Sequence, residues 1–162
     1  MRVATSRIVT FRVRKVVILS SFQIARRVFF VMAYKATIDS STNQSIHSTI
    51  LCVEDNKAYL RVRKAVLERE GYSVLAATTG AEALKLFREV AVSLVLSDHM
   101  LRGTTGVALA HQLKSIKPHV PFVLYSGTVP DIMGDADCFI SKDETVPNFL
   151  SIIKSLIKRQ SE

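Results

Sequence analysis

The chain has 162 residues, of which 48% are hydrophobic and 7% aromatic, a composition that fits a globular protein and excludes a disordered or collagen-like one. Its two cysteines, Cys52 and Cys138, each lie inside an apolar run, which predicts buried free thiols and argues against a disulfide framework or a zinc site. The net charge of +8 comes entirely from residues 1–38, which hold eight basic and no acidic side chains. From Asp39 onward the two signs balance, so the charge does not indicate nucleic-acid binding by the rest of the chain.

Residues 1–48 differ from the rest of the chain and are expected to form a basic, poorly ordered extension. Their apolar stretch is interrupted by Arg26 and Arg27, which argues against a membrane span. Three interpretations stay open: an Arg- and Ser-rich transit peptide, a basic amphipathic segment that binds anionic membranes, or a segment that is not translated, with Met32 as the natural start. The polar stretch 39–48 is predicted to be a linker to a domain over residues 49–160.

From Thr49 onward, short apolar runs alternate with amphipathic patterns. Strands are predicted over 49–53, 73–77, 93–97, 121–127 and 138–141, and helices over 56–70, 79–90, 107–117 and 148–159. Thr79 and Glu82 have the spacing of a capping box, Gly71 follows the first helix as a stop, and Pro147 suits a first turn. Strands that alternate with helices predict an α/β domain with a doubly wound parallel sheet, covered by helices on both faces.

Polar side chains come directly after these strands. Glu54 and Asp55 follow the first strand, Asp98 the third and Lys142 the fifth, and Ser126 lies at the end of the fourth. Because functional groups of an open parallel sheet collect at the carboxyl ends of its strands, we expect these side chains to lie together.

A cluster of three carboxylates has a chemical consequence. Carboxylates that crowd together repel one another, and a magnesium ion, which prefers oxygen ligands, relieves the conflict. One carboxylate, Asp98, is then a candidate nucleophile toward phosphorus, while Lys142, Ser126 and backbone N–H groups stabilise the transferred phosphoryl group.

The segments "ILCVEDN", "LVLSDHMLRGTTG", "VLYSG" and "CFISK" resemble, in order, the receiver domain of response regulators in two-component signalling. The resemblance covers about residues 49–159 and implies a five-stranded, flavodoxin-like sheet with strand order 2-1-3-4-5. It implies Asp98 as the phosphorylated residue and Lys142 and Ser126 as residues that contact the phosphoryl group. The implied magnesium ligands are Glu54, Asp55, Asp98 and the backbone carbonyl of Met100. Ser126 and Phe139 are the implied switch residues.

The chain departs from the family pattern in several places. Leu101 and Arg102 stand where receivers commonly carry Met-Pro, and Asp143 replaces the usual proline after the lysine. Phe139 has no hydroxyl at the switch position. The segment 127–137 is shorter than the family usually needs and contains Pro130 and Gly134, so a shortened or missing fourth helix is predicted there, with a changed output face.

The expected function is that of a single-domain, cytoplasmic response regulator with no membrane span. Its partners would be a sensor histidine kinase or histidine phosphotransfer protein, which supplies or receives the phosphoryl group, and a downstream protein target, with no nucleic acid bound by the receiver. The main alternative is a degenerate receiver that binds proteins without phosphorylation. A binder of nucleic acid or membrane through the basic N-terminal segment also stays open. A metal-dependent phosphatase of the haloacid-dehalogenase kind is disfavoured, because that chemistry needs a second acid where this chain has Met100.

Simpler interpretations exist for single residues. Asp98 could cap a turn, Ser126 could be an ordinary turn residue and Lys142 a surface lysine. His99 is expected to point to solvent, and the "RVRK" segment, Arg61 to Lys64, is expected to be a solvated helix face.

Overall fold

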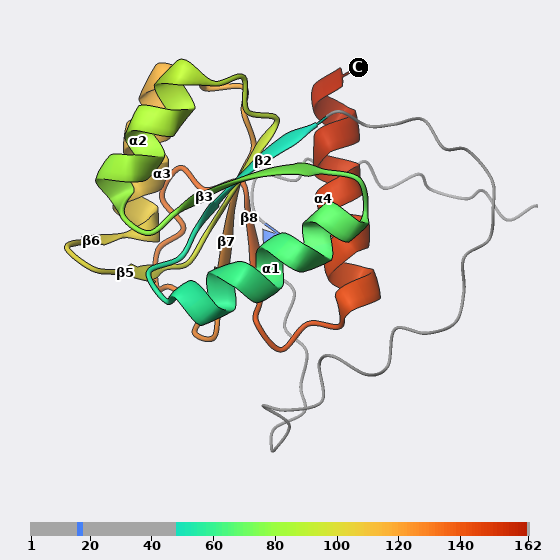
Figure 1. Ribbon diagram of the computed structural model, residues 1–162. Helices are drawn as coiled ribbons and strands as arrows, with labels where there is room; N and C mark the ends of the chain where they lie inside the picture. The colour runs from blue at the N-terminus through green and yellow to red at the C-terminus, as the bar shows by residue number, and fades with distance from the viewer. Residues whose placement is uncertain (1–15, 18–47, 162) are drawn as a thin grey trace, which may run out of the picture.

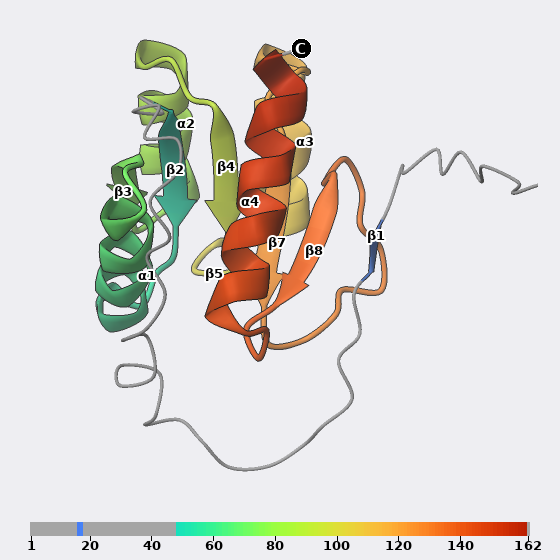
Figure 2. The same ribbon diagram turned by 90° about the vertical axis from the view of Figure 1, so that its right-hand side faces the viewer.

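The computed structural model describes residues 16–17 and 48–161. Five strands form a parallel sheet in the order β3-β2-β4-β7-β8, which confirms the predicted order 2-1-3-4-5 (Figure 2). They are β2 (Thr49–Val53), β3 (Ser73–Ala77), β4 (Leu94–Ser97), β7 (Phe122–Ser126) and β8 (Cys138–Ser141). Four of them are buried over most of their length, as expected for strands covered on both faces, whereas only Val74 and Ala77 are buried in β3, at the edge of the sheet.

A short strand that was not predicted extends this sheet. β1 (Val16–Val17) pairs in parallel with the outer edge of β8 and makes a sixth strand. The interpretations of residues 1–15 and 18–47 lie outside the described residues.

Within the described residues, four helices cover the sheet, two on each face (Figure 1 and Figure 2). α2 (Gly80–Glu89) and α3 (Gly106–Ile116) cover one face, and α1 (Lys57–Arg69) and α4 (Val146–Ser161) cover the other. Each face has its own apolar core: Phe87, Leu109 and Leu113 lie in the first, and Leu67 and Ile153 in the second. In the described part of the chain, no helix is long and apolar enough to cross a membrane.

Side-chain caps explain where three of the helices begin. Asn56, Thr79 and Thr105 each accept hydrogen bonds from backbone N–H groups in the first turn of α1, α2 and α3. One half of the predicted capping box is present, because Thr79 accepts from the backbone N–H of Glu82. The other half is displaced by one residue, because the Glu82 carboxylate accepts from the backbone N–H of Thr78, at 2.7 Å. These caps fix the direction in which each helix leaves the carboxyl edge of the sheet.

The connection between β7 and β8 contains no helix over residues 127–137, as the sequence predicted. Two polar contacts hold it against α3: a hydrogen bond between His111 and Asp135 at 2.7 Å and an ion pair between Lys114 and Asp137 at 2.5 Å. Asp137 also accepts from the backbone N–H of Phe122 at 2.7 Å. The connection is therefore fixed to α3 at two points in its second half.

A small antiparallel hairpin follows β4 and was not predicted. It consists of β5 (Met100–Leu101) and β6 (Thr104–Thr105). Gly106, directly after it, allows α3 to approach the end of β4, because a Cβ at this position would lie 2.5 Å from the carbonyl oxygen of Asp98. The glycine thus sets the distance between α3 and the candidate phosphoacceptor.

Both cysteines are buried free thiols, as predicted. Burial raises the pKa of Cys52 to about 12 and that of Cys138 to about 11. Neither thiol ionises near neutral pH, so both act as apolar packing groups.

Candidate functional site

The register of the parallel strands brings the predicted residues to one edge. Val53 pairs with Ser97, so Glu54 and Asp98 follow neighbouring strands at the same level. Ser126 pairs with Ser141 in the same way, and the backbone N–H of Lys142 donates to the carbonyl of Ser126 at 3.0 Å. The sheet topology therefore brings together residues that are up to 88 positions apart in the sequence.

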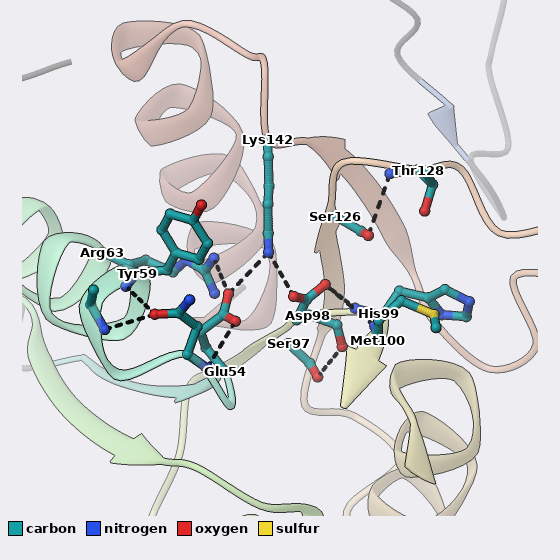
Figure 3. A network of polar contacts seen from close by, with 12 residues as sticks. Glu54, Tyr59, Arg63, Ser97, Asp98, His99, Met100, Ser126, Thr128 and Lys142 are labelled. Atoms are coloured by element: carbon teal, nitrogen blue, oxygen red, sulfur yellow. Dashed lines mark hydrogen bonds and ion pairs between the residues drawn. The ribbon is translucent and has the colours of Figure 1, made fainter. Parts of the chain in front are cut away.

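Lys142 joins the acidic side chains at the centre of the site (Figure 3). Its ammonium group lies 2.6 Å from Oδ2 of Asp98 and 3.0 Å from Oε2 of Glu54. The same group lies 5.5 Å from the ring centroid of Tyr59, on α1. Lys142 is therefore an internal counter-ion for two carboxylates and not a freely solvated lysine.

Asp98 is held in a nearly buried and donor-rich position. Its residue surface is 7% exposed, and its Oδ1 accepts from the backbone N–H of His99 at 2.6 Å and of Met100 at 3.4 Å. Burial alone would raise the pKa of Asp98, but the hydrogen bond and charge of Lys142, together with the two backbone N–H groups, hold this pKa below its usual value. Asp98 is thus ionised at neutral pH, as a nucleophile must be.

Glu54 is more deeply buried, with 1% of its surface exposed. Its Oε1 accepts from the backbone N–H of Asn56 at 3.3 Å, and its Oε2 accepts from Lys142 and from Nη2 of Arg63, each at 3.0 Å. The expectation that Arg61 to Lys64 is a solvated helix face is therefore wrong for Arg63, which is 6% exposed. The guanidinium group points inward because α1 packs this position against the sheet.

Asp55 has a different partner at the outer rim of the site. Nε of Arg102 lies 3.2 Å from its Oδ2, and the Arg102 side chain is 85% exposed. This arginine follows the two residues of β5, in the hairpin after Asp98. The pair is solvent-screened, so it contributes little to stability, but it adds a third cation to the site.

Ser126 lies on the side of Asp98 that faces away from Glu54 (Figure 3). Its side chain is buried, and its Oγ accepts from the backbone N–H of Thr128 at 3.5 Å. Phe139 is fully buried and belongs to the apolar core on the α2 and α3 side of the sheet. The Met100 side chain is exposed beside the site, and the His99 ring is only partly exposed, with Nδ1 buried, so the prediction that His99 points to solvent is wrong in part.

The oxygen-rich donor set fits a magnesium ion at Asp55 and Asp98 better than at Glu54. The Glu54 side chain is the least accessible of the three, at 1% exposed against 10% for Asp98 and 23% for Asp55. Within residues 16–17 and 48–161, no group of three or more His, Cys, Asp and Glu side chains could hold a metal ion. A magnesium ion would therefore also need backbone carbonyl and water oxygens, which this ion commonly uses.

Comparisons with known proteins agree with this arrangement. Residues 50–154 match the response regulator receiver domain family. The polar-differentiation response regulator DivK of Brucella ovis is 30% identical over 117 residues, which cover 67% of this chain and 95% of DivK. The sensor kinase CckA of Brucella abortus is 28% identical over 138 residues, but this chain spans only 15% of its length.

Solved structures show the same fold. A CheY-like receiver domain protein from Methanospirillum hungatei is 27% identical, with a TM-score of 0.68 over 71% of this chain and 97% of that one. The response regulator TrrA from Thermotoga maritima, crystallised with Mg²⁺ and BeF, is 26% identical, with a TM-score of 0.64 over 67% of this chain and 98% of that one. The sheet order, the acidic edge with its lysine and the match over residues 50–154 lead to one conclusion: this chain belongs to the response regulator receiver domain family.

Proposed function

We propose that the protein accepts a phosphoryl group on Asp98 from a phosphohistidine of a sensor histidine kinase or a histidine phosphotransfer protein. The observation that carries this proposal is the contact of Lys142 with both Asp98 and Glu54 at the carboxyl edge of the sheet. Membership of the receiver family supports the reaction class, and the TrrA structure with Mg²⁺ and BeF supports magnesium as the cofactor.

In this proposal Asp55, Asp98 and the backbone carbonyl of Met100 hold magnesium, and Glu54 adds negative charge from its fixed position. The bound ion supplies positive charge that offsets the charge of the phosphoryl group. An ionised oxygen of Asp98 forms the new bond to phosphorus, while the bond from phosphorus to the histidine nitrogen of the donor breaks. Lys142 then donates to a phosphoryl oxygen, because it already lies 2.6 Å from Asp98.

The phosphorylated form would differ from the free form around Ser126 and Phe139. Ser126 Oγ has only a long hydrogen bond to Thr128, so it is free to turn toward a phosphoryl group. Phe139 lies in the buried core, one strand away, and its rearrangement would change the surface around the β7–β8 connection. Phosphorylation would thereby shift an equilibrium between two forms that differ in affinity for a downstream protein, or the phosphate would pass to a second histidine.

A second candidate function is binding of a partner protein without phosphorylation. It is favoured by one observation: each of the three site carboxylates already has a basic partner. Lys142 serves Asp98, Lys142 and Arg63 serve Glu54, and Arg102 serves Asp55. A site with balanced charge depends less on a metal ion than a purely acidic one does.

Incubation with phosphoramidate or acetyl phosphate and Mg²⁺, followed by intact mass measurement, tests the first function. We expect a mass gain of one phosphoryl group, and we expect it to be absent with a chelator and in Asp98→Asn. Asp131→Asn, which removes an exposed carboxylate from the same domain, is the matched control and should be phosphorylated like the wild type. Absence of any gain in the wild type would refute phosphorylation and favour the second function.

A further inference from the structure

Arg63 is the most unusual residue near the site. It lies on the buried side of α1, between Leu60 and Leu67, where the neighbouring inward positions are apolar. An arginine at such a position carries a large cost, because a charged group leaves water. Its position therefore requires a partner that compensates for the lost hydration.

Two groups compensate for part of this cost. Nη2 of Arg63 lies 3.0 Å from Oε2 of Glu54, and its guanidinium carbon lies 4.4 Å from the ring centroid of Tyr125. Tyr125 in turn packs against Phe149, with ring centroids 5.0 Å apart. The contacts thus connect α1, the end of β2, the strand β7 and α4 around one cation.

The compensation is incomplete. Nε and Nη1 of Arg63 are buried and find no hydrogen-bond partner among the described residues. A leucine at this position would bury apolar surface without that cost, so packing alone does not explain the arginine. What an arginine adds is a fixed positive charge directly on Glu54.

The charge count of the site shows what this addition does. Glu54, Asp55 and Asp98 give three negative charges, and Lys142 alone would leave an excess of two. Arg63 and Arg102 remove this excess. Since Arg102 is exposed and screened by water, Arg63 is the buried and therefore the stronger of the two additional charges.

We propose that Arg63 is a positioning residue that keeps Glu54 turned into the protein and weakens magnesium binding at the site. The cation is then held mainly by Asp55 and Asp98, and its occupancy varies with magnesium concentration. This inference rests on the proposed function, because it concerns the same magnesium site.

Isothermal titration calorimetry with MgCl₂ measures the Mg²⁺ affinity directly. Tryptophan fluorescence cannot report binding, because the chain contains no tryptophan. The variants Arg63→Gln and Arg63→Met both remove the charge, and Arg63→Gln keeps a donor for Glu54 if the methionine variant does not fold. We expect either variant to bind Mg²⁺ on the order of tenfold more tightly than the wild type, because a nearby unit of positive charge is removed. The gain in Mg²⁺ affinity should be smaller at high salt, because dissolved ions screen the part of the charge interaction that passes through solvent.

Two controls separate charge from packing. Arg63→Lys keeps the charge and should bind Mg²⁺ within about twofold of the wild type. Arg61→Met removes the same charge from the exposed side of α1 and should also stay within about twofold. Equal tightening in Arg63→Lys, or no tightening in either Arg63→Gln or Arg63→Met, would overturn the inference.

The outcomes also distinguish this inference from the proposed function. If the wild type binds Mg²⁺ and is phosphorylated on Asp98, but the charge-removing variants bind no more tightly, only the role of Arg63 is refuted. If neither the wild type nor any variant binds Mg²⁺ and Asp98 is not phosphorylated, the proposed function fails and the inference fails with it.

Discussion

Removal of the Lys142 ammonium group should destabilise the fold measurably. Lys142→Met deletes two short ion pairs, to Asp98 at 2.6 Å and to Glu54 at 3.0 Å, and leaves both carboxylates buried. Breaking a buried pair by removing one partner costs about 3–5 kcal/mol. Arg63 still serves Glu54, and two backbone N–H groups still serve Asp98, so we expect the low end, about 3 kcal/mol.

Urea unfolding at neutral pH, followed by circular dichroism, measures this loss. For a domain of this size, about 3 kcal/mol corresponds to a decrease of the midpoint by roughly 1.5 M urea. The matched control is Lys154→Met, which removes an exposed lysine of α4 and should stay within about 0.5 kcal/mol of the wild type.

Magnesium provides a second measurement on the same variant. Without Lys142 the site carries an additional unit of negative charge, so MgCl₂ should raise the midpoint of Lys142→Met more than that of the wild type. A loss no larger than that of Lys154→Met would refute the claim that Lys142 is the internal counter-ion of the site.

Three further predictions concern acid stability, close packing and the thiols. Because the pKa of Asp98 is lower in the folded than in the unfolded state, its contribution to stability is present above about pH 4 and is lost as the pH falls through the folded pKa. Urea unfolding between neutral pH and about pH 3 should therefore show a steeper loss for the wild type than for Asp98→Asn, and parallel curves would contradict the lowered pKa. Gly106→Ala should cost about 3 kcal/mol, because its Cβ would lie 2.5 Å from the carbonyl oxygen of Asp98, whereas a Cβ at Gly127 has no neighbour within 4 Å and Gly127→Ala should cost far less in the same assay. A thiol reagent at neutral pH should label Cys52 and Cys138 only after unfolding, and rapid labelling of the native protein would contradict their burial.

The strands and helices could be predicted because the apolar runs, the helix caps and the helix stops all indicate the same elements. Parallel strands buried on both faces appear as continuous apolar runs, such as Ile50 to Val53, and the helices carry their own caps and stops. The same logic placed Glu54, Asp98 and Lys142 at one edge, because parallel strands share their carboxyl end. The missing helix in residues 127–137 followed from the length of the segment and its proline and glycine.

The buried arginine was missed for a definite reason. The charge of the "RVRK" segment suggests a solvated face, whereas the position of Arg63 along the helical repeat shows that it faces inward. Arg63 lies three residues after Leu60 and four before Leu67, which is the spacing of the buried stripe of α1.

Other features could not be obtained from the sequence pattern at all. The β5–β6 hairpin has two residues in each strand, too few for any alternation to be visible. The partner of Asp55 depends on this hairpin, because it carries Arg102 toward the rim of the site. The displaced capping box at Thr78 likewise depends on how the chain leaves β3.

The tight β7–β8 connection has a mechanical consequence. If this connection contained its own helix, that helix could shift when the end of β7 moves, and α3 could stay in place. Here the chain leaves Ser126 and is tied to α3 within eleven residues, through Asp135 and Asp137. We therefore expect a displacement at Ser126 to reach α3 through the contacts of Asp135 and Asp137.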